Sequence, residues 1–228
     1  MLKMKELRFR CSSLPSLMTN GRGKTPSMGE TAKNVVRDTW LGVKYGRWPQ
    51  IKSKYLAKGN LAEEDSLTLY TQYSGKIFIK NETNFKNDYL TGTPDTINPE
   101  LIDIKTPFDI WTFSKVDEAS ALKAYEWQLR GYMMLTGAKS AKLVYCLTNM
   151  PASMLSHELY KLQFDYADGE NDLEYQAQAD QIERNYIYDD IDINERVKVF
   201  EINHDEAKEA QLIERVNEAR EYAKTLRL

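Results

Sequence analysis

The sequence predicts an α/β protein in which a central mixed β-sheet is flanked by helices and followed by a C-terminal helical extension. Residues 141–147 form a short apolar run rich in β-formers, typical of a strand buried on both faces. Residues 118–136 are helical in composition and end at Gly137, and glycine commonly follows the last turn of a helix. Because helical and strand-like segments alternate along the chain, we expect a mixed sheet covered by helices.

Length and composition indicate one domain over residues 1–228, with a core at about 10–151 and a strand and helices in 152–228. No apolar run approaches the length of a membrane helix, and the first ten residues lack the apolar stretch of a signal peptide. The two cysteines, Cys11 and Cys146, are too few for a disulfide framework, a four-cysteine zinc site or an iron–sulfur cluster. We therefore expect a cytoplasmic protein with no membrane partner.

The net charge of −3 hides an uneven distribution along the chain. Residues 1–60 hold 13 Lys and Arg against 3 Asp and Glu, whereas residues 151–228 hold 9 against 19. The basic excess predicts an N-terminal part that faces nucleic acid. The acidic end is more typical of solvated helix faces.

The N-terminal segment carries a candidate phosphate-binding group. Ser12 precedes a short apolar stretch at 14–18, and a glycine-rich loop at 19–24 follows with Arg22 and Lys24. A hydroxyl, backbone N–H groups and cations together can hold a phosphate. The alternative is an ordinary helix cap followed by a flexible basic loop. The loop lacks the spacing of a Walker A motif.

Two helices are expected before the middle of the chain. Ser27 and Glu30 match a capping box and predict a helix that runs to about Leu41.

The next helix is expected at 61–70, after Asn60 as its cap, and a strand is expected at 76–80, where apolar and polar residues alternate. Glu63 either satisfies backbone donors at the start of that helix or points into a metal site.

Residues 90–108 are predicted to form a tight β-hairpin. Residues 89–91 and 101–104 have strand chemistry, and Asn98–Pro99 supplies the turn between them.

The hairpin would bring Asp95 and Asp103 together. Side chains alternate along a strand, so Ile102 and Ile104 should enter the core while Asp103 and Lys105 share the opposite face. Two neighbouring carboxylates repel each other, and Mg²⁺ is a natural counter-ion because it takes one or two carboxylates and keeps several waters. A nearby ammonium can orient such a water and offset charge on a phosphate, which suggests phosphodiester hydrolysis.

A simpler interpretation of the same residues stays open. Asp95 could cap a turn, and Asp103 with Lys105 could be an exposed ion pair on an edge strand, which contributes little.

The helix at 118–136 places Tyr125, Gln128 and Tyr132 on one face. A buried glutamine needs partners for its amide, and a hydrated metal or a phosphate could supply them. The alternative is a glutamine that is exposed or bonded to the backbone beside packed tyrosines. Farther on, we expect a helix at 170–186, a strand at 197–202 and a closing helix at 205–226.

Four short motifs occur in a characteristic order: Gly59 with Glu63, G-T-P-D ending at Asp95, D-I-K at Asp103 to Lys105, and Gln128 with Tyr132. In this order and spacing, which spans about residues 10–151, the chain resembles the PD-(D/E)XK nuclease superfamily. The resemblance is strongest to phage recombination exonucleases related to λ exonuclease and to YqaJ-like viral recombinases.

The resemblance implies a single nuclease domain with a restriction-endonuclease-like core and assigns roles to the motif residues. The implied Mg²⁺ ligands, for which Mn²⁺ should substitute, are Asp95, Asp103, the Ile104 carbonyl and Glu63 through water. Lys105 would serve the attacking water, and Gln128 would help to shape the site. Asp103 stands where a glutamate is common, so the side chain is shorter but the negative charge is the same.

The resemblance also implies an activity and partners. Members of this family digest one strand of duplex DNA from its 5′ end, as toroidal trimers in the best-known case, and work beside a single-strand annealing protein. We thus expect a 5′→3′ exonuclease that produces 3′ overhangs for phage-type homologous recombination. The residues expected to contact DNA are Arg10, Ser12, Arg22, Lys24 and Tyr132.

Two other classes of protein remain open. A structure-selective or sequence-specific endonuclease would use the same residues. A non-catalytic module that binds DNA ends is less favoured, because the acidic residues and the lysine are all present.

Overall fold

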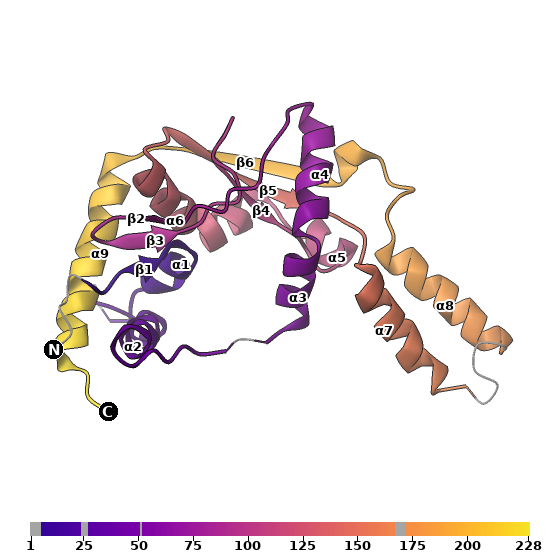
Figure 1. Cartoon of the computed structure of the whole chain (residues 1–228), viewed down its shortest axis with the longest axis horizontal. Helices are drawn as coiled ribbons and strands as arrows, with labels where there is room; N and C mark the ends of the chain where they lie inside the picture. Colours follow the sequence, from indigo (N-terminus) through magenta and orange to yellow (C-terminus); the bar gives the residue numbers. More distant parts are fainter. Residues whose placement is uncertain (1–5, 24–26, 51, 167–171) are drawn as a thin grey trace.

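The computed structural model describes residues 6–23, 27–50, 52–166 and 172–228. Its strands are β1 (Phe9–Arg10), β2 (Phe85–Lys86), β3 (Leu90–Gly92), β4 (Ile102–Lys105), β5 (Ser140–Cys146) and β6 (Val197–Asn203). Its α-helices are α1 (Leu14–Leu17), α2 (Glu30–Tyr45), α3 (Lys54–Leu61), α4 (Glu63–Ser74), α5 (Ile110–Ser114), α6 (Glu118–Thr136), α7 (Ala152–Gln163), α8 (Leu173–Tyr186) and α9 (Glu206–Thr225). Figure 1 shows that the helices surround the strands, so the predicted α/β class is confirmed.

The central sheet has the order β4-β5-β6 and is mixed. β4 runs parallel to β5, and β6 runs antiparallel to it. Leu143 of β5 packs in the larger core with residues of α6, whereas Val144 packs in a second core with Leu69 and Tyr70 of α4. Helices therefore cover both faces of β5, as the unbroken apolar run predicts.

The predicted β-hairpin at 90–108 is wrong. β3 lies in a second sheet of order β1-β3-β2, where Leu90 pairs with Phe9, and β3 does not pair with β4. Only an isolated bridge between Thr96 and Ile102 joins the two arms. β2, the antiparallel partner of β3, lies just before it in the sequence, whereas its parallel partner β1 comes from the start of the chain. Local sequence patterns do not identify a partner as distant as β1. The chain nevertheless folds back between β3 and β4.

The strand predicted at 76–80 is also absent from the structure. The predicted alternation is present, because Phe78 is 6% exposed whereas Ile77 and Ile79 are 80% and 77% exposed. These residues pair with no other strand in the described part of the chain, so alternation alone does not make a strand here.

The helix boundaries differ from the predictions in the first half of the chain. α2 starts after Gly29 without a side-chain cap, so the capping box from Ser27 is wrong, and α2 continues to Tyr45. The helix expected at 61–70 is α4, which follows directly on α3 at Ala62, and Asn60 lies inside α3 rather than capping α4.

The helix predicted at 118–136 is confirmed as α6. Asp117 caps it in a reciprocal box with Ser120. Gly137 ends it with a positive φ of 76°, a conformation that glycine adopts without steric cost.

Two elements of the C-terminal part, β6 (Val197–Asn203) and α9 (Glu206–Thr225), pack with the larger core. β6 pairs along the whole of β5, and α9 buries Leu212, Val216 and Ala219 in the larger core. Arg220 of α9 also donates hydrogen bonds to the carbonyls of Leu7 and Asp88. The predicted strand at 197–202 and closing helix at 205–226 are confirmed as β6 and α9.

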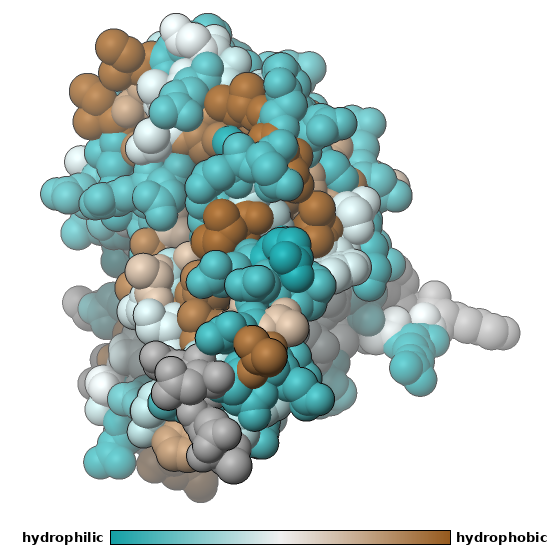
Figure 2. Space-filling view, turned by 90° about the vertical axis from the view of Figure 1, so that its right-hand side faces the viewer, coloured by the Kyte–Doolittle hydropathy of each residue, from teal (hydrophilic) through white to brown (hydrophobic). Residues whose placement is uncertain are grey.

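Helices α7 and α8 form an arm that projects from the body of the protein (Figure 1). α7 was not predicted, and the expected start of α8 at Glu170 lies outside the described residues. No residue of α7 is fully buried. Viewed from the side of the arm, Figure 2 shows hydrophobic groups in several separate places among hydrophilic ones. None of the described helices is both long and apolar enough to cross a bilayer.

Candidate active site

The centre of the candidate site is the carboxylate of Asp103, which is 2% exposed. Strand alternation turns Asp103 toward α6 while Ile102 enters the core on the other face. Gln128 of α6 donates a hydrogen bond from Nε2 to Asp103 Oδ1 at 2.8 Å. The other carboxylate oxygen, Asp103 Oδ2, pairs with Lys105. The buried carboxylate thus has one oxygen bonded to α6 and the other paired with Lys105.

Lys105 neutralises this buried charge. Its Nζ lies 2.7 Å from Asp103 Oδ2 and 4.4 Å from the ring centroid of Tyr125. Burial opposes the charged form of Lys105, but the carboxylate of Asp103 outweighs it, so the pKa of Lys105 is raised above its usual value. The side chain is therefore an ammonium at neutral pH. The alternative of an exposed ion pair on an edge strand does not fit, because Asp103 is buried.

Asp95 lies beside the Asp103–Lys105 pair. The backbone N–H of Ile104 donates to Asp95 Oδ2 at 2.6 Å, which ties the loop after β3 to β4. Burial and the charge of Asp103 together raise the pKa of Asp95 to about 7. The two acids therefore have less compensating positive charge than they need, and a divalent cation could supply it.

Glu63 stands at the first turn of α4, where it pairs with Lys80 at 3.1 Å. It lines the same hollow as Asp95, and its charge contributes to the raised pKa of Asp95. Among the described residues, no three His, Cys, Asp or Glu side chains are close enough to hold one ion directly. Asp95 and Asp103 fit Mg²⁺, which needs only one or two carboxylates, and Glu63 would reach such an ion through water.

The hollow around these residues has a volume of about 540 Å³. Aromatic side chains form much of its wall, and they are Tyr55, Phe108, Tyr125 and Tyr145. Such a wall excludes water from part of the site and strengthens the electrostatic interactions inside it.

Tyr132 does not have the predicted position of a DNA contact. Its side chain is 5% exposed, and its hydroxyl accepts a hydrogen bond from Gln128 Nε2 at 3.1 Å. A side chain on Gly92 would come within 2.7 Å of the Tyr132 ring, so glycine is needed for this close approach. Tyr132 therefore orients Gln128 and links the G-T-P-D loop to α6.

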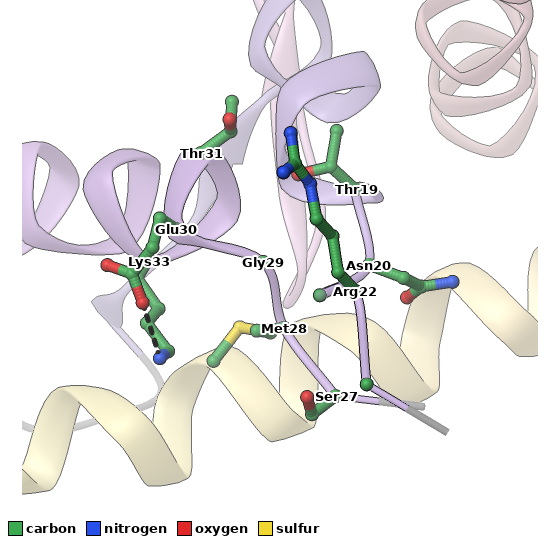
Figure 3. Close-up of a pocket in the computed structure, with 11 residues that line it drawn as sticks. Thr19, Asn20, Arg22, Ser27, Met28, Gly29, Glu30, Thr31 and Lys33 are labelled. Carbon is green, nitrogen blue, oxygen red and sulfur yellow. Dashed lines mark hydrogen bonds and ion pairs between the residues drawn. The ribbon is translucent and has the colours of Figure 1, made fainter. Parts of the chain in front are cut away.

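The residues predicted to bind a phosphate do not all lie in one place. Arg22 lines a second hollow of about 570 Å³ with Thr19, Asn20 and Ser27 at the start of α2. Figure 3 shows Arg22 and Thr19 on one side of it, and Glu30 paired with Lys33 on the other.

Two of the other predicted residues lie outside this hollow, and the third is not described. Arg10 is exposed on β1, with its guanidinium 4.8 Å from the ring centroid of Trp48, and Ser12 is exposed just before α1. Neither residue lines the hollow. Lys24 lies outside the described residues.

Sequence patterns missed Lys58, a fully buried lysine that supports the site. Its ammonium donates to the backbone carbonyls of Pro107, Phe108 and Thr148 at 2.9–3.0 Å. Burial lowers the pKa of Lys58 to about 8, so it stays mainly protonated at neutral pH. It joins α3 to the loops that follow β4 and β5. In the sequence it is one of several neighbouring lysines, and nothing in the pattern distinguishes it from them.

The raised pKa of Asp95 predicts how the stability of the metal-free protein depends on pH. The folded state keeps a proton up to a pKa of about 7, whereas the unfolded chain releases it near 3.8, so stability should fall as pH rises between these values. Asp95→Asn should then stabilise the metal-free protein by about 1–3 kcal/mol at pH 8 and change little near pH 3.8, where the charge penalty begins. Urea unfolding in EDTA measures both, and a variant destabilised at pH 8 would contradict the prediction.

No family model matches the sequence, and no curated protein matches it. Among solved structures, the chain is similar to a phage-related exonuclease from Haemophilus somnus 129PT, with 23% identity, a TM-score of 0.74, and coverage of 97% of this chain and 96% of that one. It is also similar to the alkaline exonuclease LHK-Exo from Laribacter hongkongensis, with 14% identity, a TM-score of 0.64, and coverage of 96% and 89%. The structure of LHK-Exo in complex with dAMP gives 15% identity and a TM-score of 0.63. The predicted resemblance is thus confirmed at the level of structure, and this chain has the restriction-endonuclease-like fold of phage-type and alkaline exonucleases.

Proposed function

We propose that the chain is a Mg²⁺-dependent DNA exonuclease that digests one strand of linear duplex from its 5′ end. The 3′ single strands that remain would serve phage-type homologous recombination. The fold supports the proposal, because the similar solved structures are named as exonucleases.

The observation that carries the proposal is the charge arrangement around Asp103. A buried carboxylate and a half-buried ammonium lie side by side, next to a second acid whose pKa is raised to about 7. Such an arrangement costs desolvation energy and contributes little to stability, so perturbed groups in a hollow favour a functional role.

Each residue then has a definite task. Asp95 and Asp103 would hold the metal with the Ile104 carbonyl, and Mg²⁺ bound there would supply a nucleophilic water and offset charge on the phosphate. Lys105, held as an ammonium, would orient that water and stabilise the negative charge that develops on the reacting phosphate. Gln128 fixes the orientation of the Asp103 carboxylate.

Replacing Lys105 tests the chemistry separately from DNA binding. Lys105→Ala should lower Mg²⁺-dependent digestion of end-labelled linear duplex by about 10²- to 10⁴-fold, because the ammonium acts on the reacting groups. Binding of the same duplex should stay near wild type, because most of the contacts lie elsewhere.

The matched control is Lys123→Ala, which removes an exposed lysine from α6. Asp95→Asn and Asp103→Asn should lose Mn²⁺ affinity in calorimetry as well as activity, because each removes a charged oxygen. Wild-type digestion by Lys105→Ala would refute the assignment. Cleavage of closed circular duplex at the linear rate would indicate an endonuclease instead.

The hollow beside Arg22 suggests a preference for a terminal 5′-phosphate. Such a phosphate carries more negative charge than an internal phosphodiester, so guanidinium and hydroxyl donors should favour it. Duplex with 5′-phosphate should be digested faster than duplex with 5′-hydroxyl, and Arg22→Ala should weaken end binding about 10- to 100-fold.

Arg10→Ala, measured beside Arg22→Ala, shows whether the exposed arginine on β1 contributes to the same preference. Single-turnover cleavage at saturating enzyme should survive in both variants. Equal rates on the two ends in the wild type would remove the 5′-phosphate site.

We also propose that the protein forms a ring-shaped homo-oligomer, a trimer, that acts on duplex ends beside a single-strand annealing protein. The resemblance to toroidal exonucleases supports this, and so does the separation of basic and acidic parts along the chain. Light scattering at micromolar concentration should give the mass of a trimer. A monomer mass in a preparation with full processive digestion would contradict it.

A further inference from the structure

The Lys105 ammonium contacts two partners in the site. Nζ lies 2.7 Å from Asp103 Oδ2 and 4.4 Å from the ring centroid of Tyr125. The other oxygen of Asp103 already accepts a hydrogen bond from Gln128. The ammonium is therefore the partner of the Asp103 oxygen that does not bond to Gln128.

A divalent cation held by Asp95 and Asp103 would compete for this same oxygen, because the other one accepts a hydrogen bond from Gln128. The cation and the ammonium carry like charges and would repel each other strongly at contact distance. Lys105 must then leave Asp103 Oδ2 when the metal arrives, and it needs another partner close by. Without one, the flexible side chain would turn into the open hollow and no longer reach the reacting groups.

The Tyr125 ring can be that partner. A ring face attracts an ammonium within about 6 Å of its centroid, and Lys105 already lies inside this range. The Tyr125 ring packs edge-on against Tyr145 at 6.4 Å, and Tyr145 packs against Phe200 at 6.1 Å. Tyr145 is also the residue opposite Lys105 in the pairing of β5 with β4. The position of the ring relative to the lysine is thus fixed by the sheet.

We propose, on the basis of the metal site in the proposed function, that Tyr125 is a positioning residue for Lys105. Its ring holds the ammonium when a divalent cation takes Asp103 Oδ2. The lysine then stays beside the reacting phosphate with the metal bound, at a position set by Tyr125 in place of Asp103.

The ring contact matters more with the metal bound, because Asp103 holds the lysine only in the metal-free protein. A cation–π contact changes an equilibrium constant by about 2-fold at exposed sites and by about 30-fold when it is shielded from water. Tyr125→Leu should therefore raise the Mn²⁺ dissociation constant within that range, measured by calorimetry without DNA. It should also lower kcat while KM for duplex ends stays near wild type. Tyr125→Phe keeps the ring and should behave as wild type in both measurements.

A second background separates this role from simple packing. Lys105→Met should bind Mn²⁺ at least as tightly as wild type, because the competing ammonium is gone. In that background, Tyr125→Leu should have no further effect on Mn²⁺ affinity. Tyr160→Leu, which removes an exposed tyrosine from the arm, is the control for a general effect of losing a ring.

Three outcomes would overturn the proposal. Tyr125→Leu could bind Mn²⁺ as wild type does, Tyr125→Phe could lose as much affinity as Tyr125→Leu, or the loss could persist in the Lys105→Met background. Thermal unfolding of each variant shows whether it is folded at the temperature of the titration. A wild-type protein that binds no Mn²⁺ would instead remove the metal site of the proposed function, and this inference with it.

Discussion

The buried carboxylate of Asp103 is the constraint on which the rest of the structure depends. A carboxylate taken out of water must regain its lost hydration through hydrogen bonds and opposite charge. Here Gln128 supplies the hydrogen bond and Lys105 the charge, and each comes from a different element of the core. If α6 or β4 shifted, the carboxylate would lose a partner. The geometry of the site therefore depends on how α6 packs against the central sheet.

Support for this centre comes from residues that never face the hollow. Tyr132 orients Gln128 from the same helix. Gly92 lets the chain that leads to Asp95 approach Tyr132 closely. Lys58 ties α3 to the loops after β4 and β5 from a position with no exposure to solvent. The motif residues thus hold one another in position through hydrogen bonds and close packing.

Sequence patterns predicted the parts of the fold that local forces decide. The helix ending at Gly137, the central strand and the last strand and helix follow from periodicity and capping, and the structure has them. Strand partners are decided by contacts between distant segments, so the pairing of β3 with β1 could not be predicted, nor could the lack of a partner for residues 76–80. Of the projecting arm, α8 was predicted and α7 was missed, and α7 buries no residue fully.

The candidate site was predictable for a related reason. Alternation along β4 placed Asp103 and Lys105 on one face, and helical spacing placed Gln128 and Tyr132 on one side of α6. The role of Tyr132 was not predictable, because burial decides whether a tyrosine reaches DNA or orients a neighbour. For the same reason, Lys58 could not be distinguished from the exposed lysines around it.

The central claim is that Asp95 and Asp103 share a divalent cation and that Lys105 gives up Asp103 Oδ2 to it. Anomalous diffraction from crystals grown with Mn²⁺ tests this most directly, because it locates the ion and the lysine in one map. The account predicts an ion between the two carboxylates, within coordination distance of Asp103 Oδ2, with Lys105 displaced from that oxygen. A map with no ion there at saturating Mn²⁺, and with Lys105 still paired to Asp103, would contradict it.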